Sequence, residues 1–470
     1  MKLTLDIDNP ANRGSRWAAF LALTLFAGGL RLYRLDQGFW YDEIVSFIRF
    51  FQAPWRELFT AMPLPNHHPL YSLLAKVCLL IFGEEEWAAR LPAFIAGSLT
   101  PGLVFLFGRR FWDGRTGFLA GVLLSLAMWP VWWSQDARGY ALMILFSLFA
   151  TYLFLVIYDR PSWKYAASYA LLAVLSVYSH LFAAAVIGSH FMIALTLVLK
   201  EKHGRFRKNA MLAAASLLGL FLSLLVYLPM LSDFYQFVLE QGTITTGRAM
   251  SFSFAGRLLT AWSAGYERPL LSLVVLVPGA AGLVLVARKK PLLVTALVLP
   301  IALGCLASLF TGTFVFHRFY SYGIYALYLF CAVGVTIPFT FRRWWAYWIG
   351  VAAMIAVIAV VGFTLADYYG KHKQALRTSA EWTEKTAPHK QVIALGFVSG
   401  VYRFYDHDAR LVGKDRELSR QQVENSMVVT SFAWSISKHN RNVLDDRCKK
   451  AAFFPSAGPR ELDVRVYQCE

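Results

Sequence analysis

Long apolar runs limit what this chain can fold into more than any other feature of its sequence. The chain contains nine such runs. A helix rises ~1.5 Å per residue and the hydrocarbon core of a bilayer is ~30 Å thick, so about 20 apolar residues predict one membrane-spanning helix. The runs are residues 17–33, 91–107, 116–134, 139–158, 210–231, 269–287, 291–311, 319–340 and 344–366.

One further stretch is too long for a single span. Residues 165–199 contain no Lys, Arg, Asp or Glu, and Ser179 and His180 near their middle predict a tight turn between two spans. The sequence therefore predicts a polytopic α-helical membrane protein with about eleven transmembrane helices. No small-residue cleavage site follows the first run, so we expect that run to stay as an anchor.

The composition agrees with a membrane protein and argues against nucleic-acid binding. The chain of 470 residues is 57% hydrophobic and carries a formal net charge of +17. Its Lys and Arg lie mainly in short loops between the apolar runs, where they set the orientation of the spans. We therefore expect membrane lipids around the chain and no nucleic acid.

The segment 69–83 is the one apolar stretch whose topology is ambiguous. It has only 15 residues, with Lys76 in its middle. Its apolar residues fall on one helical face, which is typical of an amphipathic helix at the membrane surface. They are Leu70, Leu73, Leu74, Val77, Leu80 and Ile81. We expect this helix not to cross the membrane.

The basic residues support this topology. With the N-terminus in the cytoplasm and 69–83 not crossing, the later cytoplasmic loops carry 15 Lys and Arg, whereas the later outer loops carry 5. This is the asymmetry of the positive-inside rule, and a crossing by 69–83 would invert it. Eleven spans also place the C-terminus outside.

The last part of the chain, 367–470, is polar, and we expect it to form a small α/β domain beside a membrane domain of residues 1–366. Its short apolar runs are residues 391–397, 427–432, 451–454 and 464–468. Cys448 and Cys469 could pair if this domain lies in an oxidising compartment.

Ionisable side chains gather in the predicted outer loops. The first outer loop, 34–90, is the longest, and the others are the short turns around residues 132–140, 180 and 311–320 and the loop 232–268. Arg can hold phosphate oxygens with two hydrogen bonds, and a carboxylate can accept the proton of an attacking hydroxyl. This combination favours an enzyme that acts on a phosphorylated lipid. The side chains are Asp42, Glu43, His67, His68, Asp136, Arg138, Tyr140, His180, His317 and Arg318.

Several motifs in these loops resemble those of the C-type glycosyltransferases, in particular glycosyltransferase family 39, with its protein O-mannosyltransferases and aminoarabinose transferases. The motifs are WYDEIVS (40–46), NHHPLYSLL (66–74), EWAARLPAFIAGSLT (86–100), GRRFWDGRTGFLAG (108–121), WSQDARGYALM (133–143), YSHLFAA (178–184) and FHRFYSYGIYAL (316–327). The resemblance departs at His68 and Gly139, where the family has proline.

The resemblance implies a membrane enzyme that moves a sugar from a polyprenyl-phosphate donor to an acceptor hydroxyl, with inversion. Asp42 would be the catalytic base, Glu43 its neighbour, and Asp136 a further acid. The donor phosphate would be bound by Arg138 and Arg318, with further contacts from His67, His68, Tyr140, His180 and His317. No metal-ligand spacing is present, so we expect no obligatory cofactor, although Asp136 could hold a divalent cation.

Several alternatives stay open at this point. Asp42 and Glu43 could cap a helix that starts near Ile44, Arg138 could only pair with Asp136, and Arg318 could extend to lipid headgroups. The protein could also be a transporter, a flippase of lipid-linked glycans, or a polysaccharide polymerase or ligase. The acceptor could be lipopolysaccharide, another glycan, a glycolipid or a protein. The polar tail favours a bacterial inner membrane, with the active site and C-terminal domain facing the periplasm.

Overall fold

The computed structural model describes residues 10–62, 66–201, 204, 206–233, 235–236, 252–265, 268–311 and 316–470. The chain divides into two compact units. The first contains Met1–Tyr33, Ala53–Gly83 and Ala88–Leu365, and the second contains Arg34–Gln52, Glu84–Trp87 and Ala366–Glu470. Two parts of the predicted outer loop 34–90 therefore group with the C-terminal region.

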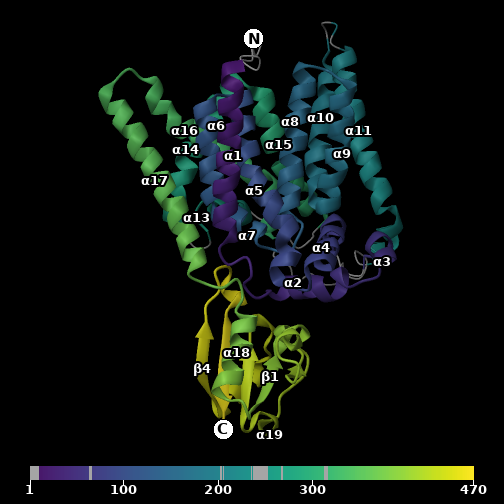
Figure 1. Cartoon of the computed structure of the whole chain (residues 1–470), viewed down its shortest axis with the longest axis vertical. Helices are drawn as coiled ribbons and strands as arrows, with labels where there is room; N and C mark the ends of the chain where they lie inside the picture. The colour runs from purple at the N-terminus through teal and green to yellow at the C-terminus, as the bar shows by residue number, and fades with distance from the viewer. Residues whose placement is uncertain are drawn as a thin grey trace. The chain divides into compact units, whose positions relative to one another are not determined.

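The first unit is helical (Figure 1). Its α-helices are α1 (Pro10–Leu32), α3 (Trp55–Thr60), α4 (Pro69–Phe82), α5 (Glu86–Phe111), α6 (Gly114–Leu126), α7 (Met128–Ser134), α8 (Tyr140–Asp159), α9 (Trp163–Ser179), α10 (Ala184–Leu199), α11 (Phe206–Tyr227), α13 (Phe252–Ala264), α14 (Pro269–Lys289), α15 (Pro291–Thr311), α16 (Ile324–Thr336) and α17 (Trp344–Tyr369). Short 3-10 helices extend them at η2 (Leu181–Ala183), η3 (Leu228–Met230), η4 (His317–Gly323) and η5 (Ile337–Thr340).

The prediction of a polytopic α-helical membrane protein is confirmed. Within the described residues, 8 helical segments are long and apolar enough to cross a membrane, or up to 9 if the bent pair α6 and α7 is one span. All of them coincide with predicted spans. The two other predicted spans are occupied by α1, with 23 residues, and α9, with 17.

The predicted span 116–134 is bent by 62° between α6 and α7. The break falls at Ala127, whose backbone is extended, with φ −65° and ψ 125°. Pro130 lies three residues later, and a proline has no N–H to offer the carbonyl four residues earlier and clashes with it. The proline thus accounts for the break, and the bend turns α7 toward the turn that carries Asp136 and Arg138.

The ambiguous segment 69–83 forms α4, which has 14 residues. At ~1.5 Å per residue this helix extends ~21 Å, less than the ~30 Å hydrocarbon core. The predicted apolar face is divided, because Leu70 is buried whereas Leu80 and Ile81 are 69% and 67% exposed. Exposed apolar side chains on such a short helix favour contact with lipid at the interface.

Glycines allow close packing of the backbones of α14 and α16. At the contact of α14 with α16, a Cβ on Gly282 would lie 1.9 Å from the Phe330 carbonyl oxygen, and one on Gly334 would lie 1.9 Å from that of Pro278. Small residues let the backbones of membrane helices approach in this way. Any larger side chain at either glycine would force the two helices apart.

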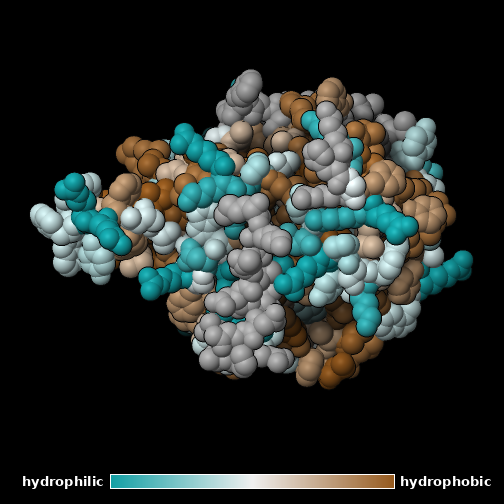
Figure 2. Space-filling view, turned by 90° about the horizontal axis from the view of Figure 1, so that it is seen from above, coloured by the Kyte–Doolittle hydropathy of each residue, from teal (hydrophilic) through white to brown (hydrophobic). Residues whose placement is uncertain are grey.

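Basic loops lie at one end of the first unit. Arg110 at the end of α5 pairs with Asp159 at the end of α8, with 3.4 Å between the charged atoms. Lys290, just after α14, donates a hydrogen bond to the Phe111 carbonyl. The view from above shows several hydrophilic side chains on this face and apolar ones along parts of its margin (Figure 2). Three of the predicted cytoplasmic loops thus share one end.

The second unit has a sheet of five strands in the order β2-β1-β3-β5-β4. The strands are β1 (Gln391–Leu395), β2 (Arg410–Val412), β3 (Ser426–Thr430), β4 (Cys448–Phe454) and β5 (Val464–Cys469). The helical elements are α2 (Tyr41–Ser46), η1 (Phe47–Phe51), α18 (Leu376–Thr386), η6 (Gly396–Gly400), η7 (Tyr402–Phe404), α19 (Arg420–Val423), η8 (Ala433–Ser435), α20 (Lys438–Arg447) and η9 (Arg460–Leu462). The prediction of a small α/β fold in the C-terminal part of the chain is therefore confirmed, whereas the predicted domain boundary at residue 366 stays a prediction.

The sheet is mixed, with both parallel and antiparallel pairs of strands. β1 runs parallel to β2 and β3, whereas β5 runs antiparallel to β3 and β4. All five residues of the central strand β3 are buried, which agrees with the apolar Met427, Val428 and Val429 at its centre. Cys448 and Cys469 face each other across β4 and β5 and form a disulfide.

Candidate active site

The two predicted acids Asp42 and Glu43 lie in the first turn of α2, in the second unit. Glu43 is fully buried, and its Oε2 accepts a hydrogen bond of 3.2 Å from the backbone N–H of Trp40, which precedes the helix. A carboxylate at this position satisfies one of the N–H groups that a helix leaves open at its start. Glu43 thus caps the helix, which is one of the alternatives that the sequence left open. Asp42, in contrast, is only partly buried.

The segment that carries Asp42 is held by residues from the C-terminal part of the same unit. The backbone N–H of Tyr41 donates to Gln374 Oε1 at 3.0 Å, and Gln374 Nε2 donates to Ser431 Oγ at 2.8 Å. The N–H of Phe39 donates to the hydroxyl of Tyr405. Residues more than 300 positions away in the sequence therefore fix the backbone on both sides of Trp40.

Aromatic packing supports the same segment. The ring of Tyr41 stacks on Phe397 at 4.6 Å between centroids and meets the edge of Phe432 at 5.4 Å. Burial, and then the charge of Asp42, raise the pKa of Tyr41 to about 12. The Tyr41 hydroxyl thus stays protonated at neutral pH, and Asp42 is the acid of this turn that remains partly accessible to solvent.

The other predicted residues lie in the first unit. Two of them, Asp136 and Arg138, lie in the turn between α7 and α8. Arg138 and Asp136 are each 1% exposed, and the N–H of Arg138 donates to the Asp136 carbonyl at 2.6 Å. Gln135 is held at the end of α1, because its Nε2 donates to the carbonyls of Arg31 at 2.9 Å and Tyr33 at 2.6 Å. The contacts of Gln135 fix the turn that presents Arg138.

Three aromatic side chains meet beside this turn. His68 lies 4.8 Å from His180 and 5.4 Å from Tyr140 between ring centroids, and Tyr140 lies 5.2 Å from His180. Gly139 permits this arrangement, because a Cβ there would lie 2.1 Å from the Ser179 carbonyl oxygen. The departure from the family motif at Gly139 thus has a steric reason in this chain.

The charge of Arg138 affects the pKa values of the nearby histidines. Burial and then the Arg138 charge lower the pKa of His180 to about 3, and the pKa of His68 lies well below its usual value for the same two reasons. Burial, partly opposed by a hydrogen bond to the Ala61 backbone and assisted by the Arg138 charge, lowers the pKa of His67 to about 4. The three imidazoles are therefore neutral at pH 7, so arginine supplies the positive charge.

Hydrogen bonds distinguish the two closest imidazoles. His68 Nδ1 lies 3.2 Å from the Ser179 carbonyl, which only accepts, so the neutral ring carries its proton on Nδ1 and leaves Nε2 as an acceptor. His180 Nδ1 accepts from the N–H of Phe182 at 3.2 Å, so its proton is on Nε2. One imidazole can thus accept a hydrogen bond from a ligand at Nε2, and the other can donate one.

The last predicted pair lies in η4. The Arg318 guanidinium lies 4.5 Å from the ring centroid of Phe316, and its charge also lowers the pKa of His180. Phe319 lies 5.5 Å from His180, and His317 lies 5.0 Å from Trp129. We refer to His67, His68, Arg138, Tyr140, His180 and Arg318 as the histidine–arginine cluster.

The structure offers no arrangement for a metal in the part of the chain that it describes, because no group of three or more His, Cys, Asp or Glu could hold an ion there. The predicted lack of an obligatory metal stays a prediction. Sequence reasoning missed Gln374, Ser431 and Tyr405, which support the acid-bearing turn. These are ordinary polar residues in the tail, and only their long-range contacts distinguish them.

The fold resembles that of the C-type glycosyltransferases ArnT and AglB. The family model for dolichyl-phosphate-mannose-protein mannosyltransferases matches residues 66–232, which include most of the histidine–arginine cluster. No curated protein sequence matches significantly. The expected resemblance to this group of glycosyltransferases is confirmed at the level of the fold.

Solved structures cover nearly the whole chain. ArnT from Cupriavidus metallidurans bound to undecaprenyl phosphate is 14% identical, with a TM-score of 0.56 over 97% of this chain and 98% of that one. Its apo form gives a TM-score of 0.55 at 12% identity, over 97% of this chain and 98% of that one. The oligosaccharyltransferase AglB from Archaeoglobus fulgidus, in complex with an inhibitory peptide and a dolichol-phosphate, is 11% identical, with a TM-score of 0.57 over 90% of this chain and 70% of that one.

Proposed function

We propose that this protein is a glycosyltransferase that moves a sugar from a polyprenyl-phosphate donor to an acceptor hydroxyl. The observation that carries the proposal is the histidine–arginine cluster, where two arginines and three neutral histidines from four segments of the chain come together. Both ArnT and AglB have this fold, and their structures contain undecaprenyl phosphate and a dolichol-phosphate. A polyprenyl phosphate is therefore the ligand that suits both the charge and the fold.

In this proposal the cluster binds the donor phosphate. Arg138 is almost fully buried, so its charge acts in a medium of low dielectric constant. Arg318 supplies the second charge, and His180 Nε2–H supplies a neutral donor. As the sugar leaves, negative charge builds on the phosphate, so these groups stabilise the transition state more than the ground state.

In this proposal His68 binds the sugar rather than the phosphate. The acceptor nitrogen of His68 cannot donate to a phosphate oxygen while the ring is neutral, but it suits a sugar hydroxyl. His67, Tyr140 and His317 are further candidates for contacts to the donor. Asp136 would orient Arg138 through the turn that they share.

Asp42 is the proposed base. The acceptor oxygen attacks the anomeric carbon and forms the new C–O bond, while the bond between that carbon and the phosphate oxygen breaks. The phosphate takes the bonding electron pair, and the Asp42 carboxylate takes the hydroxyl proton. This single displacement inverts the anomeric carbon. Glu43 supports the reaction by capping the helix that carries Asp42.

The experiment that tests this function compares cells that lack the gene with cells that carry Asp42→Asn, Asp36→Asn or the wild-type chain. Asp36 is an exposed acid in the same segment and serves as the matched control. Mass spectrometry of surface glycolipids and lipopolysaccharide should show one glycan that is lost without the gene. Asp42→Asn should not restore it, whereas Asp36→Asn should. Restoration by Asp42→Asn at a normal protein level would remove Asp42 from the mechanism.

We also propose a bacterial inner membrane, with the reaction on the periplasmic side. The disulfide between Cys448 and Cys469 supports an oxidising compartment for the second unit. An impermeant thiol reagent should label single cysteines placed at exposed Asp36 and Lys414 in intact cells whose outer membrane is permeabilised. Labelling only after lysis of the inner membrane would contradict this orientation.

A further inference from the structure

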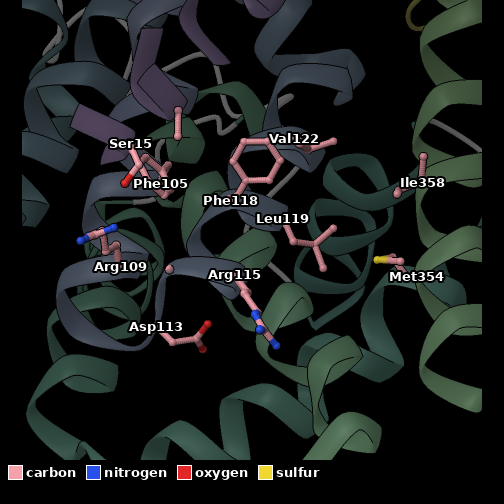
Figure 3. Close-up of a pocket in the computed structure, with 12 residues that line it drawn as sticks. Ser15, Phe105, Arg109, Asp113, Arg115, Phe118, Leu119, Val122, Met354 and Ile358 are labelled. Atoms are coloured by element: carbon pink, nitrogen blue, oxygen red, sulfur yellow. The ribbon is translucent and has the colours of Figure 1, made fainter. Parts of the chain in front are cut away.

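We propose that a cavity far from the histidine–arginine cluster binds an anionic phospholipid, independently of the proposed transferase activity. The cavity has a volume of about 840 Å³ and lies among α1, α5, α6 and α17 (Figure 3). This volume is within the ~300–1,000 Å³ that is typical of sites for small ligands. Its lining residues are Ser15, Ala19, Phe105, Arg109, Asp113, Gly114, Arg115, Phe118, Leu119, Val122, Met354 and Ile358.

The cavity lies at the opposite end of the helical unit from the cluster. Arg109 is followed by Arg110, which pairs with Asp159 at the end of α8. Tyr140 of the cluster is at the start of the same helix, which has 20 residues. At ~1.5 Å per residue, α8 separates the two places by ~30 Å. A ligand headgroup in the cavity therefore does not occupy the proposed donor-phosphate site.

The walls of the cavity suit an acyl chain. Phe105 and Leu119 come from α5 and α6, and Met354 and Ile358 come from α17 on the other side (Figure 3). Each methylene of a lipid chain that is buried adds to the favourable free energy of binding. An apolar space between membrane helices therefore favours a lipid over a polar metabolite.

The lining of the cavity carries two arginines and one acid. Arg109 and Arg115 form no ion pair with the residues that the structure describes. The one acid in the lining, Asp113, caps α6 by accepting from the N–H of Thr116 at 2.9 Å and from its hydroxyl at 2.6 Å. Two guanidinium groups beside an apolar cavity suit a phosphate group that carries acyl chains.

These features together select one occupant. A zwitterionic phospholipid would bring a cation to two arginines, whereas an anionic head brings only negative charge. A polyprenyl phosphate shares the phosphate, but its headgroup belongs with the histidine–arginine cluster in the proposed function. We therefore commit to a glycerophospholipid with an anionic head, and phosphatidylglycerol is the probe.

The test uses the full chain, purified in detergent and supplied with phosphatidylglycerol, phosphatidylcholine or undecaprenyl phosphate. Native mass spectrometry measures the bound lipid. The double variant Arg109→Gln, Arg115→Gln should bind phosphatidylglycerol at least tenfold more weakly than the wild type. The matched control is Arg342→Gln, Arg343→Gln, which changes two exposed arginines outside the lining and should bind like the wild type.

A second pair of variants tests the apolar part without a change of charge. Met354→Trp fills the cavity and should also weaken phosphatidylglycerol binding, whereas Ile355→Trp changes the neighbouring residue, which is 60% exposed, and should not. Equal binding of phosphatidylglycerol and phosphatidylcholine by the wild type would overturn the proposal. Wild-type affinity for phosphatidylglycerol in the double arginine variant would also overturn it. So would a variant that loses binding of undecaprenyl phosphate but keeps binding of phosphatidylglycerol.

Discussion

Replacement of Arg138 by glutamine should weaken binding of a polyprenyl phosphate more than any other single change in the cluster. Arg138 is 1% exposed, and its charge acts on three histidines that come from other turns. It is therefore the electrostatic centre of the site. Glutamine keeps most of the length of the side chain and two N–H donors but removes the charge.

The size of the effect follows from the loss of one charged contact. A hydrogen bond between a charged group and its partner contributes ~1.5–3 kcal/mol. At ~1.4 kcal/mol per factor of ten, the dissociation constant should rise about 10- to 150-fold. Arg138→Lys should recover only part of this loss, because lysine restores the charge but not the planar fork that binds two phosphate oxygens.

The assay is the binding of undecaprenyl phosphate to the purified chain in detergent, measured at constant ionic strength. Arg268→Gln is the matched control, because Arg268 lies 5.2 Å from the ring of Phe363 and is not part of the cluster. Both variants should elute as folded protein and unfold at similar temperatures. Affinity within twofold of the wild type in Arg138→Gln would refute the role of the cluster as a phosphate site.

Three further changes test other parts of the structure. Gln374→Leu removes the acceptor of the Tyr41 N–H at a cost of ~1–3 kcal/mol, so transfer should fall about 5- to 150-fold. Undecaprenyl phosphate should still bind normally, and Gln374→Glu should restore activity. Burial first, and then Arg138, lower the pKa of His67 from 6.5 to about 4 in the folded chain, so the unfolded chain takes up this proton first as the pH falls. Stability should therefore drop by ~3 kcal/mol between about pH 6.5 and 4, and thermal unfolding of His67→Gln should show less of this acid loss. Cys448→Ser removes a disulfide that spans 21 positions and should lower the free energy of unfolding of the second unit by ~3 kcal/mol. A reducing agent should cause the same loss in the wild type and no further loss in the variant.

The sequence predicted the membrane helices well because length and apolarity determine them locally. The spans around α8, α14 and α15 need no information from elsewhere in the chain. The break at Ala127 was missed, since an apolar run shows the same composition whether or not it bends. Pro130 was the visible indication, because proline removes a helical hydrogen bond.

The candidate site was predictable only in part. The turns that carry His68, Arg138 and His180 lie at one end, because an even number of predicted spans separates each turn from the next. Their hydrogen-bond roles do not, because the donor and acceptor nitrogens of His68 and His180 depend on contacts with backbone atoms at particular distances. Short strands such as β2, with three residues, are also too brief to show a period.

The support of the acid-bearing turn by distant residues could not be derived from sequence. Gln374 and Tyr405 are polar residues in a polar region, and nothing in their local pattern distinguishes them from their neighbours. Their contacts with Tyr41 and Phe39 connect residues that lie 333 and 366 positions apart. Such contacts depend on the three-dimensional path of the whole chain.

The grouping of Arg34–Gln52 with Ala366–Glu470 has a consequence for biosynthesis. Translation proceeds at ~5–20 residues per second, so the segment with Asp42 is made roughly 15 to 60 seconds before the residues that hold it. The long apolar helices from α5 to α17 are synthesised during that interval. A nascent chain thus completes its lipid-embedded part first, and the turn that carries the proposed base acquires its packing partners only when the last hundred residues have been synthesised.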